Sequence, residues 1–331
     1  MSDKSEPICW QPQADLEMTQ SRAALLAAIR SFFAARDVIE VETPLLGSSS
    51  ATDPNLESCL LAGQSDRYLQ TSPEFAMKRM LAAEPAAIYQ ICKAFRAGES
   101  GRRHNVEFTL LEWYQPGFDL AELMDEVQTL VQACIGSGHQ VHEEIRRVPY
   151  ASAFHKSTGL NPHTASLDEL LAVAQSEAGV AREVIMTDSA LATRSSCLDL
   201  LASHLVEAEL SEPTFLYDYP ACQCALARVG KDGEGHRVAK RFELFIEGME
   251  LANGYLELTD AVELRHRFEL DNRQRQLLKK ATIPVDERLL AAMACGLPDC
   301  AGVAVGVDRL LMVVTGAGSI QEVLTFPSER A

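Results

Sequence analysis

The chain has 331 residues, 47% of them hydrophobic, so it can bury a large core and lies near the upper size limit of a single domain. Its 47 acidic and 30 basic residues give a formal net charge of -17, which argues against binding long nucleic acids by nonspecific phosphate attraction. The nine cysteines contain no CxxC pair and no stretch approaches the length that spans a bilayer, so we expect a cytoplasmic protein with reduced thiols and no membrane partner.

The first half of the chain is predicted to alternate helices and strands. A helix over residues 15–36 has its large apolar side chains at helical spacing, with Thr19 or Ser21 as its N-cap. The elements that follow are a strand that begins at Val38 and ends at Pro44, a helix over 73–83, strands over 87–95 and 106–114, and a helix over 120–135.

The second half has a less regular start. It is predicted to contain helices over 166–178 and 195–209, a strand over 214–220, two strands around a turn within 241–258, helices over 266–280 and 286–296, and a strand that leads into a helix within 302–316. The polar, glycine-rich loop 229–237 is either a mobile lid that orders on substrate binding or a hairpin tip, and the tip is commoner. No repeat or linker divides the chain, so residues 15–331 are predicted to form one domain after an N-terminal extension, residues 1–14.

The segment FRAGESGRRHNVEFTLLEWY, residues 95–114, joins a basic hairpin to a strand. Residues two apart on a strand share a face, so Phe108, Glu112 and Tyr114 should line one wall. The hairpin before it offers donors suited to a polyphosphate, namely Arg96, Arg102, Arg103 and His104. The alternative is a solvated basic loop beside an ordinary strand.

Two further segments carry charge where a sheet core is expected. In ELFIEGMELANGYLEL, Glu243, Glu250 and Glu257 recur among apolar residues, and buried carboxylates are costly unless a cation compensates them. Mg²⁺ bound with substrate phosphates, or a substrate amine, would do so. The segment GVAVGVDRL uses small residues where a ligand or backbone must come close, and it then places Arg309 at the start of a helix.

Taken together, these segments resemble the three motifs of class II aminoacyl-tRNA synthetases. VIEVETPLL is similar to the first motif, FRAGESGRRHNVEFTLLEWY to the second and GVAVGVDRL to the third. In detail, SPE, KRFE, ELANGYLEL and GVDR resemble the catalytic domain of lysyl-tRNA synthetase, over nearly the whole chain from about residue 15. The resemblance implies an α+β fold, mostly an antiparallel β-sheet flanked by helices.

The resemblance also implies an ATP site. Arg96 would hold the α-phosphate and the carboxylate of the amino acid, and Arg309 would cover the adenine and reach the γ-phosphate, which makes these two the expected catalytic residues. Phe108 would stack under the adenine. The remaining residues implied for ATP are Arg103, His104 and Asn105 near the phosphates, and Glu243 and Glu250 as ligands of Mg²⁺, with Glu243 also counted in the ATP site.

An amino-acid site is implied beside it. Two carboxylates and a phenol would satisfy the three donors of a substrate ε-ammonium, and the residues in those positions are Glu112, Tyr114 and Glu257. The other residues implied for the amino acid are Ser72, Glu74 at the backbone amine, Asn253 at the carboxylate, Arg96 and Ala304.

The chain departs from lysyl-tRNA synthetases in three ways. It has no anticodon-binding OB-fold, so tRNA anticodon recognition is not expected, and it has Ala304 where the synthetases have glycine. A methyl group there changes the pocket by about one methylene, worth roughly 1 to 3 kcal/mol of discrimination, although Ala304 could equally be a packing residue. The second motif usually has glutamate at the position of Gly98, so either Glu99 replaces it or a contact to the ATP site is lost.

The missing OB-fold and Ala304 are also features of the bacterial elongation factor P–(R)-β-lysine ligases, which are paralogues of lysyl-tRNA synthetase. The resemblance to that family implies activation of (R)-β-lysine by ATP and its transfer to a lysine of elongation factor P. Two alternatives stay open: a ligase that activates α-lysine for another acceptor, and a catalytically silent regulator. The similarity of the first motif implies a homodimer.

Overall fold

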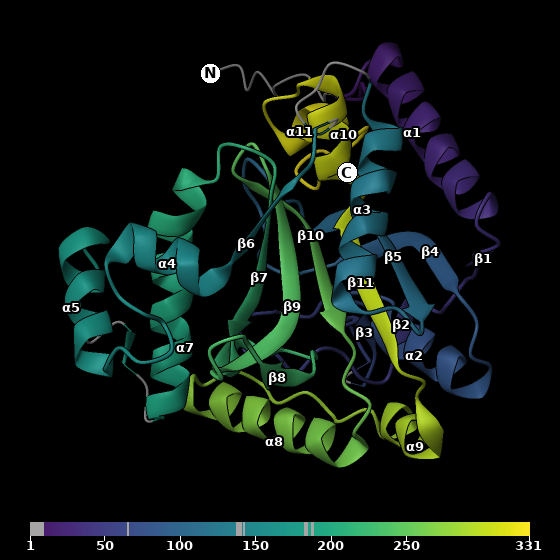
Figure 1. The fold of residues 1–331 in the computed structure, drawn as a ribbon. Helices are drawn as coiled ribbons and strands as arrows, with labels where there is room; N and C mark the ends of the chain where they lie inside the picture. The colour runs from purple at the N-terminus through teal and green to yellow at the C-terminus, as the bar shows by residue number, and fades with distance from the viewer. Residues whose placement is uncertain (1–9, 65, 137–140, 142, 182–184, 187–188) are drawn as a thin grey trace, which may run out of the picture.

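The computed structural model describes residues 10–64, 66–136, 141, 143–181, 185–186 and 189–331. In this part of the chain, helices surround a large central sheet (Figure 1). The strands are β1 (Ile39–Glu40), β2 (Leu46–Gly47), β3 (Tyr68–Leu69), β4 (Ile88–Phe95), β5 (Glu107–Pro116), β6 (Arg146–Pro149), β7 (Thr214–Pro220), β8 (Val229–Lys231), β9 (Arg237–Ile246), β10 (Met249–Leu256) and β11 (Cys300–Gly306).

The central sheet has the strand order β1-β4-β5-β11-β10-β9-β7-β6, and β8 pairs with β9. Neighbouring strands are antiparallel except for the two outermost pairs, β1 with β4 and β6 with β7. The prediction of an α+β protein with a mostly antiparallel sheet is confirmed. The order brings β5, β11, β10 and β9 together at the middle of the sheet, so segments far apart in the sequence meet there.

Three groups of helices bury separate parts of the core (Figure 1). The first packs on the sheet through α1 (Leu16–Ala34), α3 (Leu120–Cys134), α10 (Val307–Thr315) and α11 (Ile320–Val323). The second consists of α2 (Glu74–Ala83), α8 (Ala261–Leu277) and α9 (Glu287–Gly296). The third, called here the helical insert, consists of α4 (Tyr150–Thr158), α5 (Leu167–Glu177) and α7 (Ala190–Leu201), continued by a π-helical turn (Ala202–Val206) and a 3₁₀ turn (Glu207–Glu209).

The N-cap predicted for the first helix is wrong. Asp15 caps α1, because its Oδ1 accepts a hydrogen bond of 2.8 Å from the backbone N–H of Met18. Thr19 and Ser21 lie inside the helix, where their hydroxyls donate to the carbonyls four residues earlier. The apolar face was predicted correctly, and its members are buried: Leu25, Ile29, Phe32 and Phe33.

Other boundaries also differ from the predictions. The first strand covers only Ile39–Glu40, because it pairs with β4 at a sheet edge for two residues. The predicted helix over 195–209 starts earlier and stops being α-helical at Leu201. The loop 229–237 is a hairpin, since β8 and β9 pair in register across it, so the hairpin-tip interpretation is confirmed.

Of the predicted extension, residues 1–9 lie outside the described residues. Gln13 and Ala14 donate backbone hydrogen bonds to Thr325 and Leu324, which ties this segment to the end of the chain. Within the described ranges, no helix is long and apolar enough to cross a membrane, and the cysteines form no disulfide.

Candidate active site

A cavity of about 1730 Å³ lies over the central strands, and it is bordered by α2, α8 and the helical insert. The residues that the resemblance implied for the ATP, metal and amino-acid sites all line this cavity: Ser72, Glu74, Arg96, Arg103, His104, Asn105, Phe108, Glu112, Tyr114, Glu243, Glu250, Asn253, Glu257, Ala304 and Arg309. They come from six elements and the loops between them, so the fold brings together side chains up to 237 positions apart, from residue 72 to residue 309. Arg102, the remaining donor predicted on the hairpin, does not line it, and its Nε donates to the carbonyl of Gly318 at 2.7 Å.

Strand register explains the floor of the cavity. Ala304 on β11 is paired with Glu112 on β5 and with Asn253 on β10, so its methyl group lies between these two side chains. Two residues away, Gly302 is paired with Tyr114 and Tyr255. A Cβ at Gly302 would lie 2.4 Å from the Tyr114 ring, so glycine is required where that ring crosses the strand.

The part of the cavity around Glu112, Tyr114 and Glu257, called here the acidic pocket, is almost fully enclosed. Glu112 and Glu257 expose 3% and 1% of their surface, and the Tyr114 hydroxyl donates to Glu112 Oε1 at 2.7 Å. Burial raises the pKa of Glu112 to about 8, with Glu74 adding to the shift. Burial also raises the pKa of Glu257 to about 7, against the effect of Lys78. The pocket therefore favours a cationic partner.

Lys78 on α2 is a member of the pocket that the sequence analysis missed. Its ammonium lies 2.6 Å from Glu74 Oε1 and 2.6 Å from Glu257 Oε2, and its side chain is 2% exposed. Burial lowers the pKa of Lys78, but Glu257 and Glu74 outweigh this effect and hold it above its ordinary value. The only signal in the sequence was the spacing of four residues from Glu74, which is equally typical of an exposed helix pair.

The opposite part of the cavity is basic. Arg96 lies 5.1 Å from the centroid of the Phe108 ring and 3.8 Å from Glu99 Oε1. Its buried Nε has no hydrogen-bond partner among the residues that the structure describes. Gly98 has a φ of 78°, a left-handed conformation that favours glycine, and the turn it makes brings Glu99 to Arg96. Of the two possibilities for the second motif, this geometry supports replacement by Glu99.

Arg309 and its neighbours form a connected group. Arg309 Nη1 donates to the carbonyl of Glu250 at 2.7 Å, and its Nη2 lies 2.7 Å from His104 Nε2. Burial and Arg309 lower the pKa of His104, which keeps its ring neutral. Arg103 donates to the carbonyl of Gly248 at 2.6 Å, so the turn between β9 and β10 holds the basic hairpin.

Asn105 has a structural contact within this region. Its Nδ2 donates to the carbonyl of Glu107 at 2.6 Å, and its Oδ1 accepts from the backbone N–H of Ser328 at 3.1 Å. The side chain of Asn105 thus links the basic hairpin to the end of the chain.

Carboxylates gather at the edge of the cavity on β9 and β10. Burial raises the pKa of Glu243 to about 7, while Arg241 opposes the shift and Glu250 adds to it. Arg241 donates to Glu243 Oε1, and the Tyr219 hydroxyl donates to Oε2 at 2.7 Å. Arg241 and Tyr219 were missed by the sequence analysis. Glu243 and Glu250 both present carboxylate oxygens at this edge of the cavity. Carboxylate oxygens are ligands that Mg²⁺ prefers, so these two residues fit a Mg²⁺ site.

Comparison with known sequences agrees with this geometry. The sequence model of the family described as tRNA synthetases class II (D, K and N) matches residues 11–330. The chain belongs to this class II synthetase family. The resemblance seen in the sequence and the fold that it implied are therefore confirmed.

Several relatives of this class II synthetase chain carry one name, "Elongation factor P--(R)-beta-lysine ligase". The protein from Avibacterium paragallinarum is 41% identical over 331 residues, which cover 97% of this chain and 98% of the relative. The protein from Sodalis glossinidius is 41% identical and covers 99% of this chain and 100% of the relative. The protein from Haemophilus ducreyi is 42% identical over the full length of both chains.

Proposed function

We propose that the protein uses ATP to activate (R)-β-lysine as an aminoacyl-adenylate and then transfers it to the ε-amino group of a lysine on elongation factor P. One observation carries the proposal: a single cavity joins an acidic pocket to a basic region that contains Arg96 and Arg309. This arrangement suits a diamine acid next to a polyphosphate. The full-length similarity to relatives named as elongation factor P–(R)-β-lysine ligases supports the choice of substrates.

In this proposal the acidic pocket binds the ammonium group at the far end of the substrate. Glu112 and Glu257 supply the charge, and the Tyr114 oxygen accepts a hydrogen bond from the ammonium while its own proton is donated to Glu112. Asn253 and Arg96 hold the carboxylate of the amino acid, and Glu74 with Ser72 holds its second amine. Ala304 fills the space between Glu112 and Asn253, where it disfavours an amine on the α-carbon relative to one on the β-carbon.

The ATP part of the proposal uses the basic region. Arg96 binds the α-phosphate, and Phe108 and Arg309 enclose the adenine. The other phosphates lie near Arg103, His104 and Asn105. Glu243 and Glu250 would hold Mg²⁺, which neutralises phosphate charge when bound.

The reaction needs no nucleophile from the protein. A carboxylate oxygen of the amino acid attacks the α-phosphorus, the bond to the bridging oxygen of pyrophosphate breaks, and a mixed anhydride forms. Arg96 and Arg309 stabilise the charge that develops on the phosphate oxygens, because their guanidinium groups are fixed before the reaction. The acceptor amine, in its neutral form, then attacks the carbonyl carbon, the bond from that carbon to the phosphate oxygen breaks, and AMP leaves with the bonding electron pair. The proton lost from the new amide nitrogen passes to the phosphate of AMP or to water.

The remaining expectations are also part of the proposal. Residues 15–331 form one catalytic domain, and the enzyme works in the cytoplasm. A homodimer is supported by exposed apolar side chains near the edge strand β1 and the small sheet: Ile39, Leu45, Leu46 and Leu60. Sizing the protein at assay concentrations tests this, and a monomer with full activity contradicts it.

The function is tested by ATP–pyrophosphate exchange with (R)-β-lysine and with α-lysine side by side. We expect exchange that depends on the amino acid and prefers (R)-β-lysine. Arg96→Ala should abolish it, whereas Arg265→Ala is a matched control because Arg265 only pairs with Glu287 at the surface. Preference for α-lysine would favour a general lysine ligase, and no exchange with either substrate would favour a silent regulator. Transfer to purified elongation factor P follows as the second assay.

A further inference from the structure

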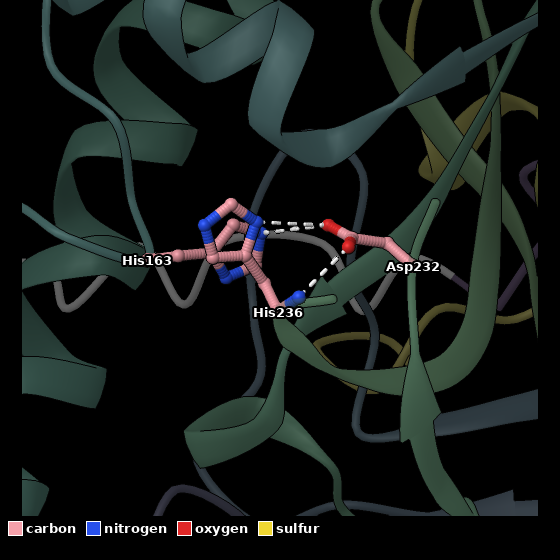
Figure 2. A group of neighbouring side chains, drawn as sticks. All are labelled: His163, Asp232 and His236. Atoms are coloured by element: carbon pink, nitrogen blue, oxygen red, sulfur yellow. Dashed lines mark hydrogen bonds and ion pairs between the residues drawn. The ribbon is translucent and has the colours of Figure 1, made fainter. Parts of the chain in front are cut away.

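A second group of polar side chains lies outside the acidic pocket and the ATP region. His163 is in the connection between α4 and α5 of the helical insert, and Asp232 and His236 are in the hairpin between β8 and β9. Figure 2 shows the three side chains converging from these two parts of the chain. Among the residues that the structure describes, they are the group whose ligand atoms are close enough to share a metal ion.

The distances within this group suit a small cation. His236 Nδ1 lies 3.2 Å and His163 Nε2 lies 3.9 Å from the same oxygen, Asp232 Oδ2. All three ligand atoms lie within 4.8 Å of one another. Ligands bound tetrahedrally to Zn²⁺ at about 2.0 to 2.2 Å are roughly 3.4 Å apart. The two nitrogen-to-oxygen distances bracket that value, so small side-chain rotations would complete the geometry.

His163 adds an independent observation. Its side chain is only 6% exposed, and its Nε2 is buried without a hydrogen-bond partner in the described part of the chain. A buried imidazole nitrogen normally has a partner, because leaving it unsatisfied costs free energy. The His163 and His236 rings stack at 4.7 Å with an angle of 10°, which turns both towards the carboxylate (Figure 2).

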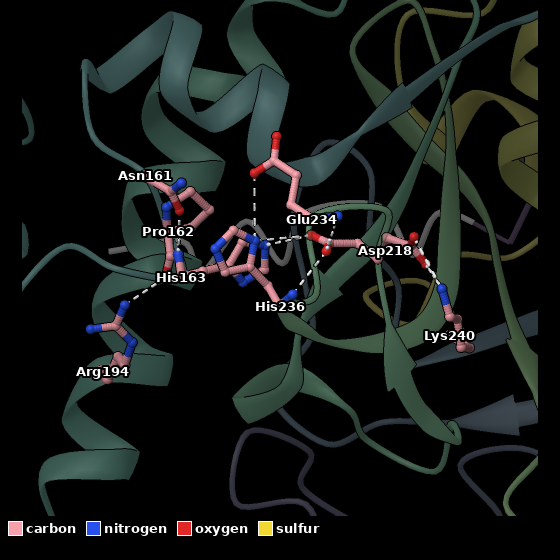
Figure 3. A network of polar contacts seen from close by, with 9 residues as sticks. Asn161, Pro162, His163, Arg194, Asp218, Glu234, His236 and Lys240 are labelled. Carbon is pink, nitrogen blue, oxygen red and sulfur yellow. Dashed lines mark hydrogen bonds and ion pairs between the residues drawn. The ribbon is translucent and has the colours of Figure 1, made fainter.

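Surrounding hydrogen bonds hold both sides of this group in place (Figure 3). On the helical insert, Arg194 donates to the carbonyls of Pro162 and Ala165, and the backbone N–H of His163 donates to Asn161 Oδ1 at 2.8 Å. On the hairpin, Asp232 Oδ1 accepts from the backbone N–H groups of residues 234 and 236 at 2.9 Å each. Because Oδ1 is used for the turn, Oδ2 is the oxygen left to face the two rings. Such supporting contacts are typical of metal sites.

We propose that His163, Asp232 and His236 form a binding site for a divalent transition metal ion of the Zn²⁺ type. Two imidazoles and one carboxylate favour this class over Mg²⁺ or Ca²⁺, which prefer ligand sets made of oxygen. The fourth position is left to water or to Glu234, whose Oε2 lies 3.6 Å from His236 Nδ1. The site is separate from the Mg²⁺ position proposed at Glu243 and Glu250.

A bound ion would join the hairpin to the helical insert. The base of this hairpin carries Val229 and Arg237, which line the large cavity. The ion would therefore restrain the hairpin at the rim of the cavity without touching the reacting atoms. The expected effect of metal binding is thus a fixed position of the hairpin. Binding of the ion itself can be measured without any assay of activity.

The experiment titrates Zn²⁺ into the full-length protein, previously treated with a chelator, in competition with a chromophoric zinc indicator. We expect one Zn²⁺ per chain, and at least about a tenfold weaker affinity in His163→Ala and in His236→Ala. Asp232→Asn should also weaken binding while its amide oxygen preserves the turn. His204→Gln is the matched control, since His204 is an exposed histidine of the helical insert that bonds to the Leu200 carbonyl. Thermal midpoints without metal show whether each variant folds.

Co²⁺ as a second probe identifies the ligands. Nitrogen and oxygen ligands give weak visible bands, whereas cysteine ligation adds a strong near-ultraviolet band. The proposal is overturned if the protein binds no Zn²⁺, if the double variant His163→Ala/His236→Ala binds it as tightly as the parent, or if Co²⁺ gives the cysteine band. Cleavage of the hairpin by trypsin should also slow when Zn²⁺ is added to the parent and remain unchanged in the double variant.

Discussion

Replacing Lys78 with methionine tests the charge balance of the acidic pocket. Methionine keeps most of the shape of the lysine side chain but removes the ammonium that lies 2.6 Å from both Glu74 and Glu257. Removing one partner of a buried ion pair costs about 3 to 5 kcal/mol, because the other charge stays buried without compensation. The entropy of unfolding for a chain of 331 residues is about 0.7 kcal/mol/K, so the thermal midpoint should fall by about 4 to 7 °C.

The loss should depend on pH. The pKa of Glu257 is already raised to about 7 by burial, and it should rise further without Lys78. When a carboxyl group has a higher pKa in the folded than in the unfolded state, the free energy of unfolding of the protein falls as pH rises through the folded-state pKa. The destabilisation by Lys78→Met should therefore be small at pH 5, where Glu257 is protonated, and larger at pH 8, where more of it is ionised.

Differential scanning calorimetry at both pH values measures this effect. The double variant Lys78→Met/Glu257→Gln is the control, because it removes both charges and should recover most of the thermal midpoint at pH 8. An equal loss at pH 5 and pH 8, or a double variant as unstable as Lys78→Met alone, would refute the reasoning.

Three further predictions concern substrate binding. Ala304→Gly should lower the ratio of kcat/KM for (R)-β-lysine to that for α-lysine by roughly 5- to 150-fold in pyrophosphate exchange; an unchanged ratio would make Ala304 a packing residue. The KM for (R)-β-lysine should fall as pH rises through about 8, where Glu112 ionises, and Glu112→Gln should remove this dependence; a profile that persists in that variant contradicts the assignment. Gly302→Ala would place a Cβ 2.5 Å from Glu257 Oε1. It should lower kcat/KM for the amino acid by roughly 5- to 150-fold and leave the KM for ATP unchanged. Equal effects on both substrates would indicate a general fold defect.

Local patterns predicted the main elements and the walls of the cavity. Alternation along β5 placed Glu112 and Tyr114 on one face, and the register with β11 confirms that both face the cavity. Resemblance to a known family supplied the grouping of the motifs, and every residue selected in this way lines one cavity. Their roles in binding and catalysis stay predictions until they are measured.

The residues that were missed depend on long-range burial. Lys78 is separated from Glu257 by most of the chain, so nothing near it in the sequence distinguishes a buried ion pair from an exposed one. Tyr219 meets Glu243 because β7 and β9 are neighbours, whereas Arg241 lies two residues before Glu243 on the same face of β9. The N-cap was misassigned for a local reason: Asp15, Thr19 and Ser21 are all acceptable caps by residue type, and the position of the first turn decides among them.

The two faces of β11 have different consequences for evolution. Val303 and Val305 fill the core under the sheet, whereas Gly302, Ala304 and Gly306 face the cavity. A single substitution on the second set can change which amino acid is accepted while the packing beneath stays the same. Substrate range in this family can therefore diverge in small steps along one strand. An insertion of one residue would instead exchange the faces, place valine in the binding pocket and leave holes in the core.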